Sequence, residues 1–173
     1  GEDGYGIQVS DGATLTAEGC VVVGNMAAGI LVEEPGTKGV FTDTVFRDTR
    51  PNENGEAGYG VLIGDGAQLL AEGCEVTGNH AEGVVAFHPG TQVTLRDSTI
   101  AGTASGADKR GMVAIGVAAQ EGASISASGL LVQDHEGPGL YTVCSGSQLS
   151  CTGCTLRGNR FAGAAVVDGG TLE

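Results

Sequence analysis

Two aspartates, Asp43 and Asp97, are the first candidates for acid–base chemistry in this chain. They lie at equivalent places in two copies of a repeated unit, in the stretches TDTVF and RDSTI. If two turns of a coil separate them, their spacing is about 9.6 Å, which suits an inverting glycoside hydrolase. Neighbouring units carry glycine at the same place, Gly19 and Gly73, and a turn position favours both glycine and aspartate. We therefore rank the turn interpretation above the catalytic one.

A histidine, His88, is the third catalytic candidate. It lies in the stretch FHPG, which parallels EEPG at Glu33 to Gly36, so turn geometry also explains its position. The other histidines, His80 and His135, fall at corners of the repeat, where a hydrogen-bonded structural role is expected. The repeat places no nucleophile beside any of the three. The sequence also lacks the short motifs of serine hydrolases, nucleotide-binding loops and zinc proteases.

The five cysteines raise the question of a disulfide or a zinc site. Cys20 and Cys74 are two turns apart, about 9.6 Å, which is beyond the roughly 7 Å that a disulfide can bridge between Cα atoms. Cys151 and Cys154 form a CxxC pair across one corner, with Cys144 nearby, but zinc needs about four ligands and no second pair is present. We expect packed thiols rather than a local disulfide, and no bound metal or cofactor.

An internal repeat determines the positions of all these residues in the fold. The stretch AEGCVVVGN (17–25) returns as AEGCEVTGN (71–79) and CTGCTLRGN (151–159), and the basic unit is about 23 residues, as from Gly6 to Gly29. Each unit alternates apolar and polar residues in three short bursts separated by glycine-containing corners, which is typical of strands. Such strands bury their apolar sides only by stacking. The sequence predicts an all-β, right-handed parallel β-helix of about six and a half turns over residues 1–173, as a single domain.

The same alternation predicts which side chains face the core. In the third unit Leu69 and Val76 should point inward, and Gln68 and Thr77 outward. One further column recurs at the corner after the third strand, and stacked amides there hydrogen-bond to turn backbone. We expect an asparagine ladder built from Asn25, Thr49, Asn79, Thr103, His135 and Asn159.

The unit GIxV…G…L…GCxVxGN and its ladder resemble the pectate-lyase-like superfamily of parallel β-helices, and are similar to repeats of secreted and surface bacterial proteins. The resemblance implies the fold and a secreted or cell-surface location. That superfamily includes polysaccharide lyases, hydrolases, epimerases, adhesins and passive scaffolds, so the fold does not decide the function. Its lyases and hydrolases carry Asp and Glu on the outer face of the first strand. We assign to that face a column without a carboxylate: Gln8, Leu31, Leu62, Val85, Ala118, Tyr141 and Ala165.

The absence of a carboxylate from this column favours a non-catalytic scaffold or binding module, with a carbohydrate-active enzyme as the alternative. Leu31, Leu62, Val85 and Tyr141 would form an apolar stripe on the first-strand face, and a contiguous stripe indicates an interface. Two long insertions, 47–59 and 102–112, enter this face from the adjoining corner. They would rim the stripe through Arg47, Arg50, Asn52, Asn54, Tyr59, Lys109 and Arg110. Equally, the loops could fold back and cover it.

The charge of the chain limits its partners. With 8 basic and 21 acidic residues, the net charge is −13, which opposes binding to nucleic acid, anionic lipid or polyuronate unless calcium intervenes. No apolar run approaches the roughly 18 residues of a membrane-spanning helix. The sequence starts at one repeat and stops within another, so we expect a fragment of a longer chain. Expected partners are a protein or the rest of that chain, a polysaccharide, or an end-to-end or face-to-face homo-oligomer.

Overall fold

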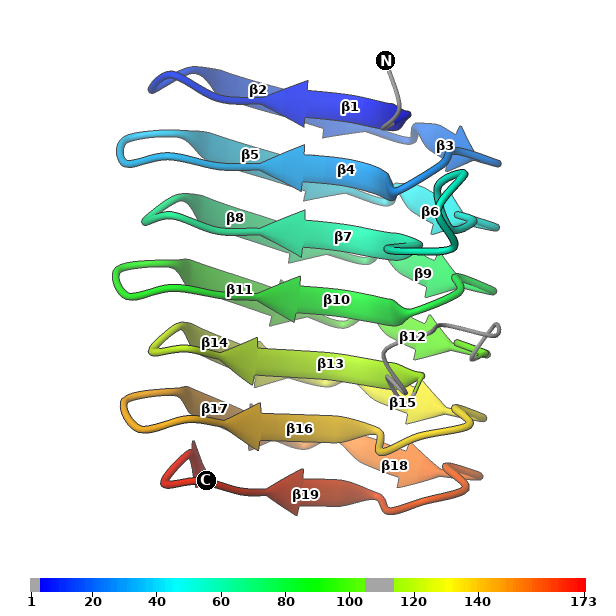
Figure 1. Ribbon diagram of the computed structural model, residues 1–173, viewed down its shortest axis with the longest axis vertical. Coiled ribbons are helices and arrows are strands. Elements are labelled where there is room, and N and C mark those ends of the chain that lie inside the picture. Colours follow the sequence, from blue (N-terminus) through cyan, green and yellow to red (C-terminus); the bar gives the residue numbers. More distant parts are fainter. Residues whose placement is uncertain (1–3, 105–113) are drawn as a thin grey trace.

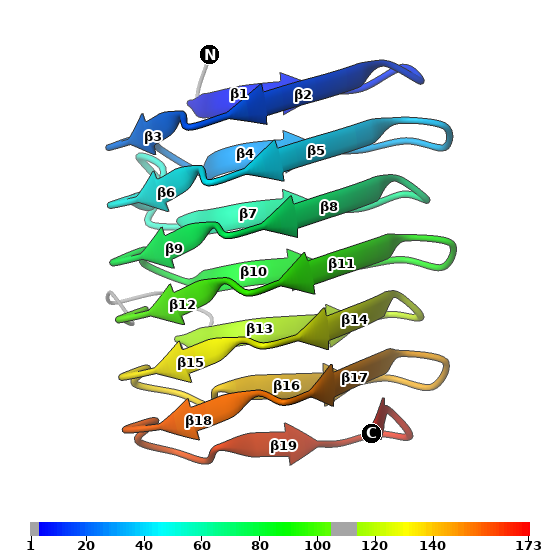
Figure 2. The ribbon, with the colours of Figure 1, turned by 180° about the vertical axis from the view of Figure 1, so that it is seen from behind.

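Three parallel sheets wind around one core (Figures 1 and 2). The computed structural model describes residues 4–104 and 114–173, and these ranges contain twenty strands and no helix. Each turn of the coil adds one strand to each sheet in succession, so that every strand pairs in parallel with the equivalent strand of the next turn. The predicted parallel β-helix, with three short strands per turn and six complete turns plus part of a seventh, is confirmed.

Sheet A holds the first strand of each turn: β1 (Tyr5–Val9), β4 (Ala28–Val32), β7 (Tyr59–Ile63), β10 (Glu82–Ala86), β13 (Ile115–Gln120), β16 (Leu140–Val143) and β19 (Ala164–Val166). Sheet B holds the second: β2 (Thr14–Glu18), β5 (Lys38–Thr42), β8 (Gln68–Glu72), β11 (Gln92–Arg96), β14 (Ser124–Ser128), β17 (Gln148–Thr152) and β20 (Thr171–Leu172). Sheet C holds the third: β3 (Val21–Val23), β6 (Val45–Arg47), β9 (Glu75–Thr77), β12 (Thr99–Ala101), β15 (Leu131–Gln133) and β18 (Thr155–Arg157). Within the described residues, no helix is long and apolar enough to cross a membrane.

The inward columns follow the predicted alternation in sheets B and C. Leu69 and Val76 are 4% and 3% exposed, whereas Gln68 is exposed and Thr77 is half-buried. Because the strands are paired in exact register, for example Leu69 with Val93, each inward side chain stacks on its equivalent in the next turn. One continuous apolar cluster results, running from Val9 to Leu149.

The predicted ladder forms in part at the corner between sheets C and A: Asn79, His135 and Asn159 bond to turn backbone, whereas the buried hydroxyls of Thr49 and Thr103 have no hydrogen-bond partner among the described residues. Asn79 Oδ1 accepts a hydrogen bond from the Thr49 backbone N–H at 3.0 Å, and His135 Nδ1 accepts one from the Thr103 N–H at 3.2 Å. His135 Nε2 therefore carries the proton and donates to the Ile100 carbonyl at 3.1 Å. Burial lowers the pKa of His135, so this side chain stays neutral in its ladder position. It is a structural residue, as expected.

A glycine stands opposite the ladder in each turn, and in all turns but the last no side chain fits there. A methyl group at Gly60 would lie 2.5 Å from Asn79 Nδ2 and from Val76 Cγ1, and 2.6 Å from the Gly83 carbonyl oxygen. The side chains could adjust, but the carbonyl belongs to the backbone of the next turn. This close approach of strand to corner explains why the repeat returns to glycine at this position.

We expect Gly60→Ala to lower the free energy of unfolding by about 1–3 kcal/mol through overpacking, measured by chemical denaturation. Gly163 is the matched control because it occupies the same column in the last turn. A methyl group there meets only Leu156, at 3.7 Å, which is an ordinary contact. Gly163→Ala should therefore change stability by less than about 0.5 kcal/mol. Equal losses in the two variants would contradict this account of the glycine column.

The cysteines differ from the prediction at one point. Cys151 and Cys154 form a disulfide, with their Cα atoms 5.9 Å apart, so the expectation of packed thiols is wrong for this pair. The other cysteines carry free thiols: Cys74 is buried, Cys144 half-buried and Cys20 exposed in the first turn. Burial raises the pKa of the Cys74 thiol, which makes it the less reactive protonated form.

Candidate functional site

The outer face of sheet A does carry a carboxylate, contrary to the sequence-based expectation. Gly60 faces the ladder and Val61, the next residue, belongs to the core, so two consecutive residues point inward. Strict alternation fails at this point in each turn. As a result the residue before each glycine joins the outer face, and Tyr59 and Ile115 pack there against Val85 and Ala118. The same register places Glu82, which pairs with Ile115, on that face.

The apolar stripe is largely covered. Leu31 and Val85 are 5% and 4% exposed, while Leu62 and Tyr141 are half-buried. Glu82 precedes Val85 on β10, and Gln120 follows Ala118 on β13. The Gln120 amide donates to the Glu82 carboxyl oxygens at 3.1 and 3.3 Å. Since Val85 and Ala118 are paired neighbours between them, the bonded side chains pass over this part of the stripe.

A pocket of about 220 Å³ opens beside this bridge. Its floor is apolar, two aromatic side chains flank it, and three polar side chains complete the wall; the lining residues are Leu62, Val85, Tyr59, Phe87, Glu82, Gln120 and Glu121. Of the predicted binding residues, the structure thus brings Leu62, Val85 and Tyr59 together. Leu31 and Tyr141 lie on the same face and do not line the pocket.

Glu82 is the most perturbed acid of the site. Its side chain is only 1% exposed. Burial raises the pKa of the Glu82 carboxyl from 4.5 to about 7, against the opposing effect of the Gln120 hydrogen bond. A carboxyl group that changes charge near neutral pH can donate a proton, accept one, or bind a cation. Glu82 can therefore do chemistry that an ordinary surface glutamate cannot.

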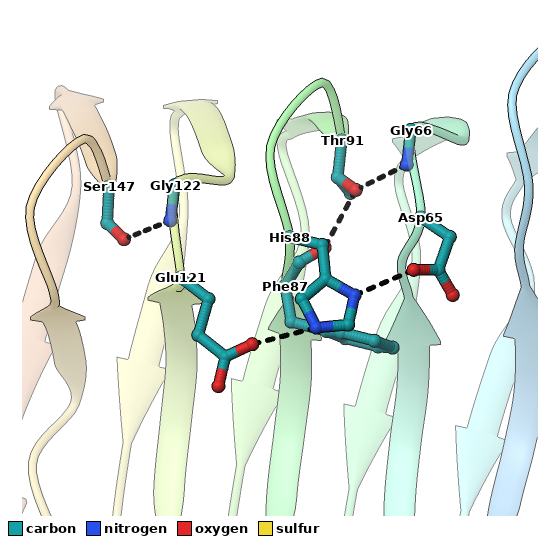
Figure 3. Close-up of polar contacts among 8 residues, drawn as sticks. All are labelled: Asp65, Gly66, Phe87, His88, Thr91, Glu121, Gly122 and Ser147. Carbon is teal, nitrogen blue, oxygen red and sulfur yellow. Dashed lines mark hydrogen bonds and ion pairs between the residues drawn. The ribbon is translucent and has the colours of Figure 1, made fainter.

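A histidine bridge lies next to the pocket, at the short turns between sheets A and B. Figure 3 shows His88 between two acids of the neighbouring turns: Nδ1 is 2.7 Å from Asp65 Oδ1, and Nε2 is 2.8 Å from Glu121 Oε2. All three residues have left-handed backbone, with φ of 54° at Asp65, 67° at His88 and 51° at Glu121. Donation to both carboxylates requires the imidazolium form. Because the three side chains are 43–56% exposed, the bridge contributes little stability, but it orients Glu121 at the pocket.

The turns that carry this bridge are held by repeated hydroxyl contacts. Thr91 Oγ1 accepts from the Gly66 N–H at 3.0 Å and donates to the Phe87 carbonyl at 2.7 Å (Figure 3). Phe87 and His88 meet edge to face with ring centroids 4.7 Å apart. The Phe87 ring lies over Gly64, where a methyl group would collide with it. Phe87 is therefore fixed as one wall of the pocket.

The aspartate pair does not reach the pocket. Asp43 and Asp97 lie at corners between sheets B and C with φ of 47° and 46°, and their Oδ1 atoms occupy the space where Gly73 and Gly129 of the next turn have no side chain. Each aspartate thus fills the gap above a glycine. This arrangement agrees with the turn interpretation, and neither residue lines a pocket with the other.

The described insertion, 47–59, folds onto itself beside the start of β7 (Figure 1). Asn52 Oδ1 accepts from the backbone N–H groups of Asn54 (3.1 Å) and Glu56 (3.0 Å), so Asn52 is a loop-closing residue. Arg47 pairs with its neighbour Asp48 at 3.4 Å, and Arg50 bridges to Met26 through the backbone. Tyr59 is the residue of this insertion that lines the pocket. In the second insertion, Lys109 and Arg110 lie outside the described residues.

Metal ligands do not converge within the described ranges. No group of three or more His, Cys, Asp or Glu side chains in residues 4–104 and 114–173 could hold a metal ion. Although His88, Asp65 and Glu121 are adjacent, the imidazole lies between the two carboxylates and separates them.

Comparisons with known proteins agree with this architecture. The family model described as "Right handed beta helix region" matches residues 40–173. A solved structure described as the crystal structure of pectate lyase Pel9A superposes with a TM-score of 0.50 at 11% identity. The match covers 91% of this chain and 51% of that chain, so the protein spans about half the length of the pectate lyase, and the likeness concerns the fold alone. A search of curated proteins gave no significant match. Because the family model covers well over half of the chain, the protein belongs to the right-handed β-helix family.

Proposed function

We propose that this β-helix is a non-catalytic binding module that holds one sugar unit of a glycan in the sheet A pocket. The observation that carries the proposal is the composition of the 220 Å³ pocket, whose lining combines two aliphatic side chains, two aromatic side chains, two carboxyl groups and one amide. Binding sites for small ligands commonly combine mostly apolar walls with a few placed polar groups. The proposed setting is a secreted or cell-surface protein.

Two considerations favour a glycan over a protein partner. The stripe first considered as a protein interface is largely covered, since Leu31 and Val85 are buried. The face also has more aromatic surface than the stripe alone indicates, because both Tyr59 and Phe87 line the pocket. A sugar ring presents C–H groups to aromatic faces and hydroxyls to acceptors such as Glu82 and Gln120.

A calorimetric titration of the protein with a panel of oligosaccharides tests the proposal. We expect at least one to bind, and Phe87→Ala to weaken that binding about tenfold or more through the loss of one wall. Thr94→Ala, on the outer face of sheet B in the same turn, is the control and should bind as the wild type does. Thermal melts check that both variants remain folded. If no oligosaccharide binds, or if Phe87→Ala binds normally, the pocket is not a glycan site.

A carbohydrate-active enzyme is the second candidate function. It is favoured by one observation: Glu82, with its raised pKa, and Glu121, paired with His88, line the same pocket. Glycoside hydrolysis uses two carboxyl groups in different protonation states, one as the acid and one as the base or nucleophile. Release of reducing ends or unsaturated products from the same panel would favour this candidate, provided that Glu82→Gln abolishes the release and keeps binding. Binding without product favours the module.

A further inference from the structure

The polar residues that line the pocket include acids but no base. Its polar groups are two carboxyl groups and one amide, and no Lys, Arg or His side chain is among the residues that line it. The imidazole of His88 contacts Glu121 from outside the lining and is also bonded to Asp65. Within the described part of the chain, the pocket therefore offers acceptors and negative charge without a counter-ion.

Glu82 is the group that most needs a cation. A carboxylate with 1% exposure is normally paired with a positive charge, because desolvation of an unpaired charge is costly. The partner present is the neutral Gln120 amide. A carboxylate has about four acceptor sites, and one amide nitrogen with its two hydrogens cannot fill them all. A ligand ammonium group entering the pocket would supply the missing donors and the missing charge.

The aromatic walls favour the same kind of ligand. Ammonium groups bind to the faces of Tyr and Phe rings within about 6 Å of the ring centre. Tyr59 and Phe87 flank the pocket, and the apolar floor of Leu62 and Val85 lies between them. Aromatic rings together with carboxylates are a recurrent means of recognising organic cations. The overall charge of −13 adds a field that attracts cationic glycans and repels polyuronates.

From these contacts we infer that the sugar bound in this pocket carries a free amino group, whose ammonium form pairs with Glu82 while the ring lies on the half-buried Leu62. The ligand class is a glycan that contains unacetylated amino sugars. This inference rests on the proposed function, because it names the ligand of the same pocket. The inferred ligand differs from the acidic polysaccharides, because a uronate carboxylate in this pocket would face the carboxylates of Glu82 and Glu121 and be repelled by them.

The test compares three matched probes by calorimetry near neutral pH and at moderate salt: oligomers of glucosamine, of N-acetylglucosamine and of galacturonate. We expect the glucosamine oligomer to bind at least tenfold more tightly than the acetylated one, and the galacturonate oligomer not to bind. Glu82→Gln should reduce this preference to within about threefold, chiefly by weakening the binding of the glucosamine oligomer.

Asp97→Asn is the control for general electrostatic attraction. It also removes one negative charge, but at a corner between sheets B and C away from the pocket. The preference for glucosamine should survive in Asp97→Asn. If both variants lose it equally, overall charge rather than the pocket selects the ligand, and the inference fails. Equal binding of the amino and acetylated oligomers to the wild type also refutes it but leaves the proposed function standing. If no glycan binds, both fail.

Discussion

Replacing Phe46 by alanine is expected to lower the free energy of unfolding by about 3–5 kcal/mol. Phe46 is 1% exposed and packs edge to face against Phe41, with ring centroids 5.3 Å apart and an interplanar angle of 77°. These two rings are the largest side chains of the core. The turns above and below are held in place by their own backbone pairing, so they cannot close the space that the ring leaves. Urea denaturation followed by circular dichroism measures the loss.

Arg47→Ala is the control in the same strand. Arg47 follows Phe46 in β6 and points outward, where it is exposed and forms an ion pair with its neighbour Asp48. Its truncation should change stability by less than about 0.5 kcal/mol. Comparable losses from the two variants would show that β6 does not alternate as described. A small loss from Phe46→Ala alone would mean that the core can collapse around the missing ring.

The fold could be predicted because its information is local and repeated. Each unit carries its own alternation and its own corner glycines, and the equivalent positions agree from turn to turn. Leu69 and Val76 faced the core as predicted because sheets B and C alternate strictly along short strands. The ladder was also predictable, since Asn79 and Asn159 recur at one position of the repeat.

The site was less predictable because it depends on a local break in that alternation. The consecutive inward residues Gly60 and Val61 move Tyr59 and Glu82 to the outer face of sheet A, and a rule of strict alternation assigns them to the core. One signal was present in the sequence: an inward Glu82 would have been an unpaired charge in an apolar core. The burial of Val85 could not be predicted from the sequence either, because it depends on a hydrogen bond between Gln120 and Glu82, which are 38 residues apart in the chain.

Turn geometry predicted the place of His88 but not its partners. Its left-handed backbone fits the short turn after the first strand, as the parallel with EEPG indicated. Asp65 and Glu121 lie 23 and 33 residues away, and only the stacking of turns brings their carboxylates to the two ring nitrogens. Similarly, the disulfide between Cys151 and Cys154 depends on how one corner folds, which spacing alone left open.

The second large effect is a dependence of stability on pH that originates at Glu82. The pKa of this carboxyl is 4.5 in a model peptide and about 7 in the folded protein. Below pH 4.5 the carboxyl group is protonated in both the folded and the unfolded state, so it does not lower the free energy of unfolding. As the pH rises from there through 7, the unfolded chain loses the proton first, so the folded state is progressively disfavoured. The free energy of unfolding should therefore be highest in acid, fall by about 3 kcal/mol as the pH rises, and level off above the pKa of the folded state.

Denaturation curves of the wild type and of Glu82→Gln over this pH range isolate the contribution of Glu82, because all other titrating groups are common to both. Glutamine has the shape of the protonated acid and keeps a partner in Gln120, so the two proteins should be almost equally stable in acid. Above pH 7 the variant should be the more stable by about 3 kcal/mol. A difference that stays flat across the range would show that burial does not raise the pKa of Glu82 in the folded protein. A glucosamine oligomer should reduce the difference at neutral pH if its ammonium group pairs with the carboxylate, because a ligand that binds the folded state of the wild type raises its stability by mass action. The pH dependence of folding and the selectivity of the pocket are then two consequences of one unpaired, buried carboxyl group.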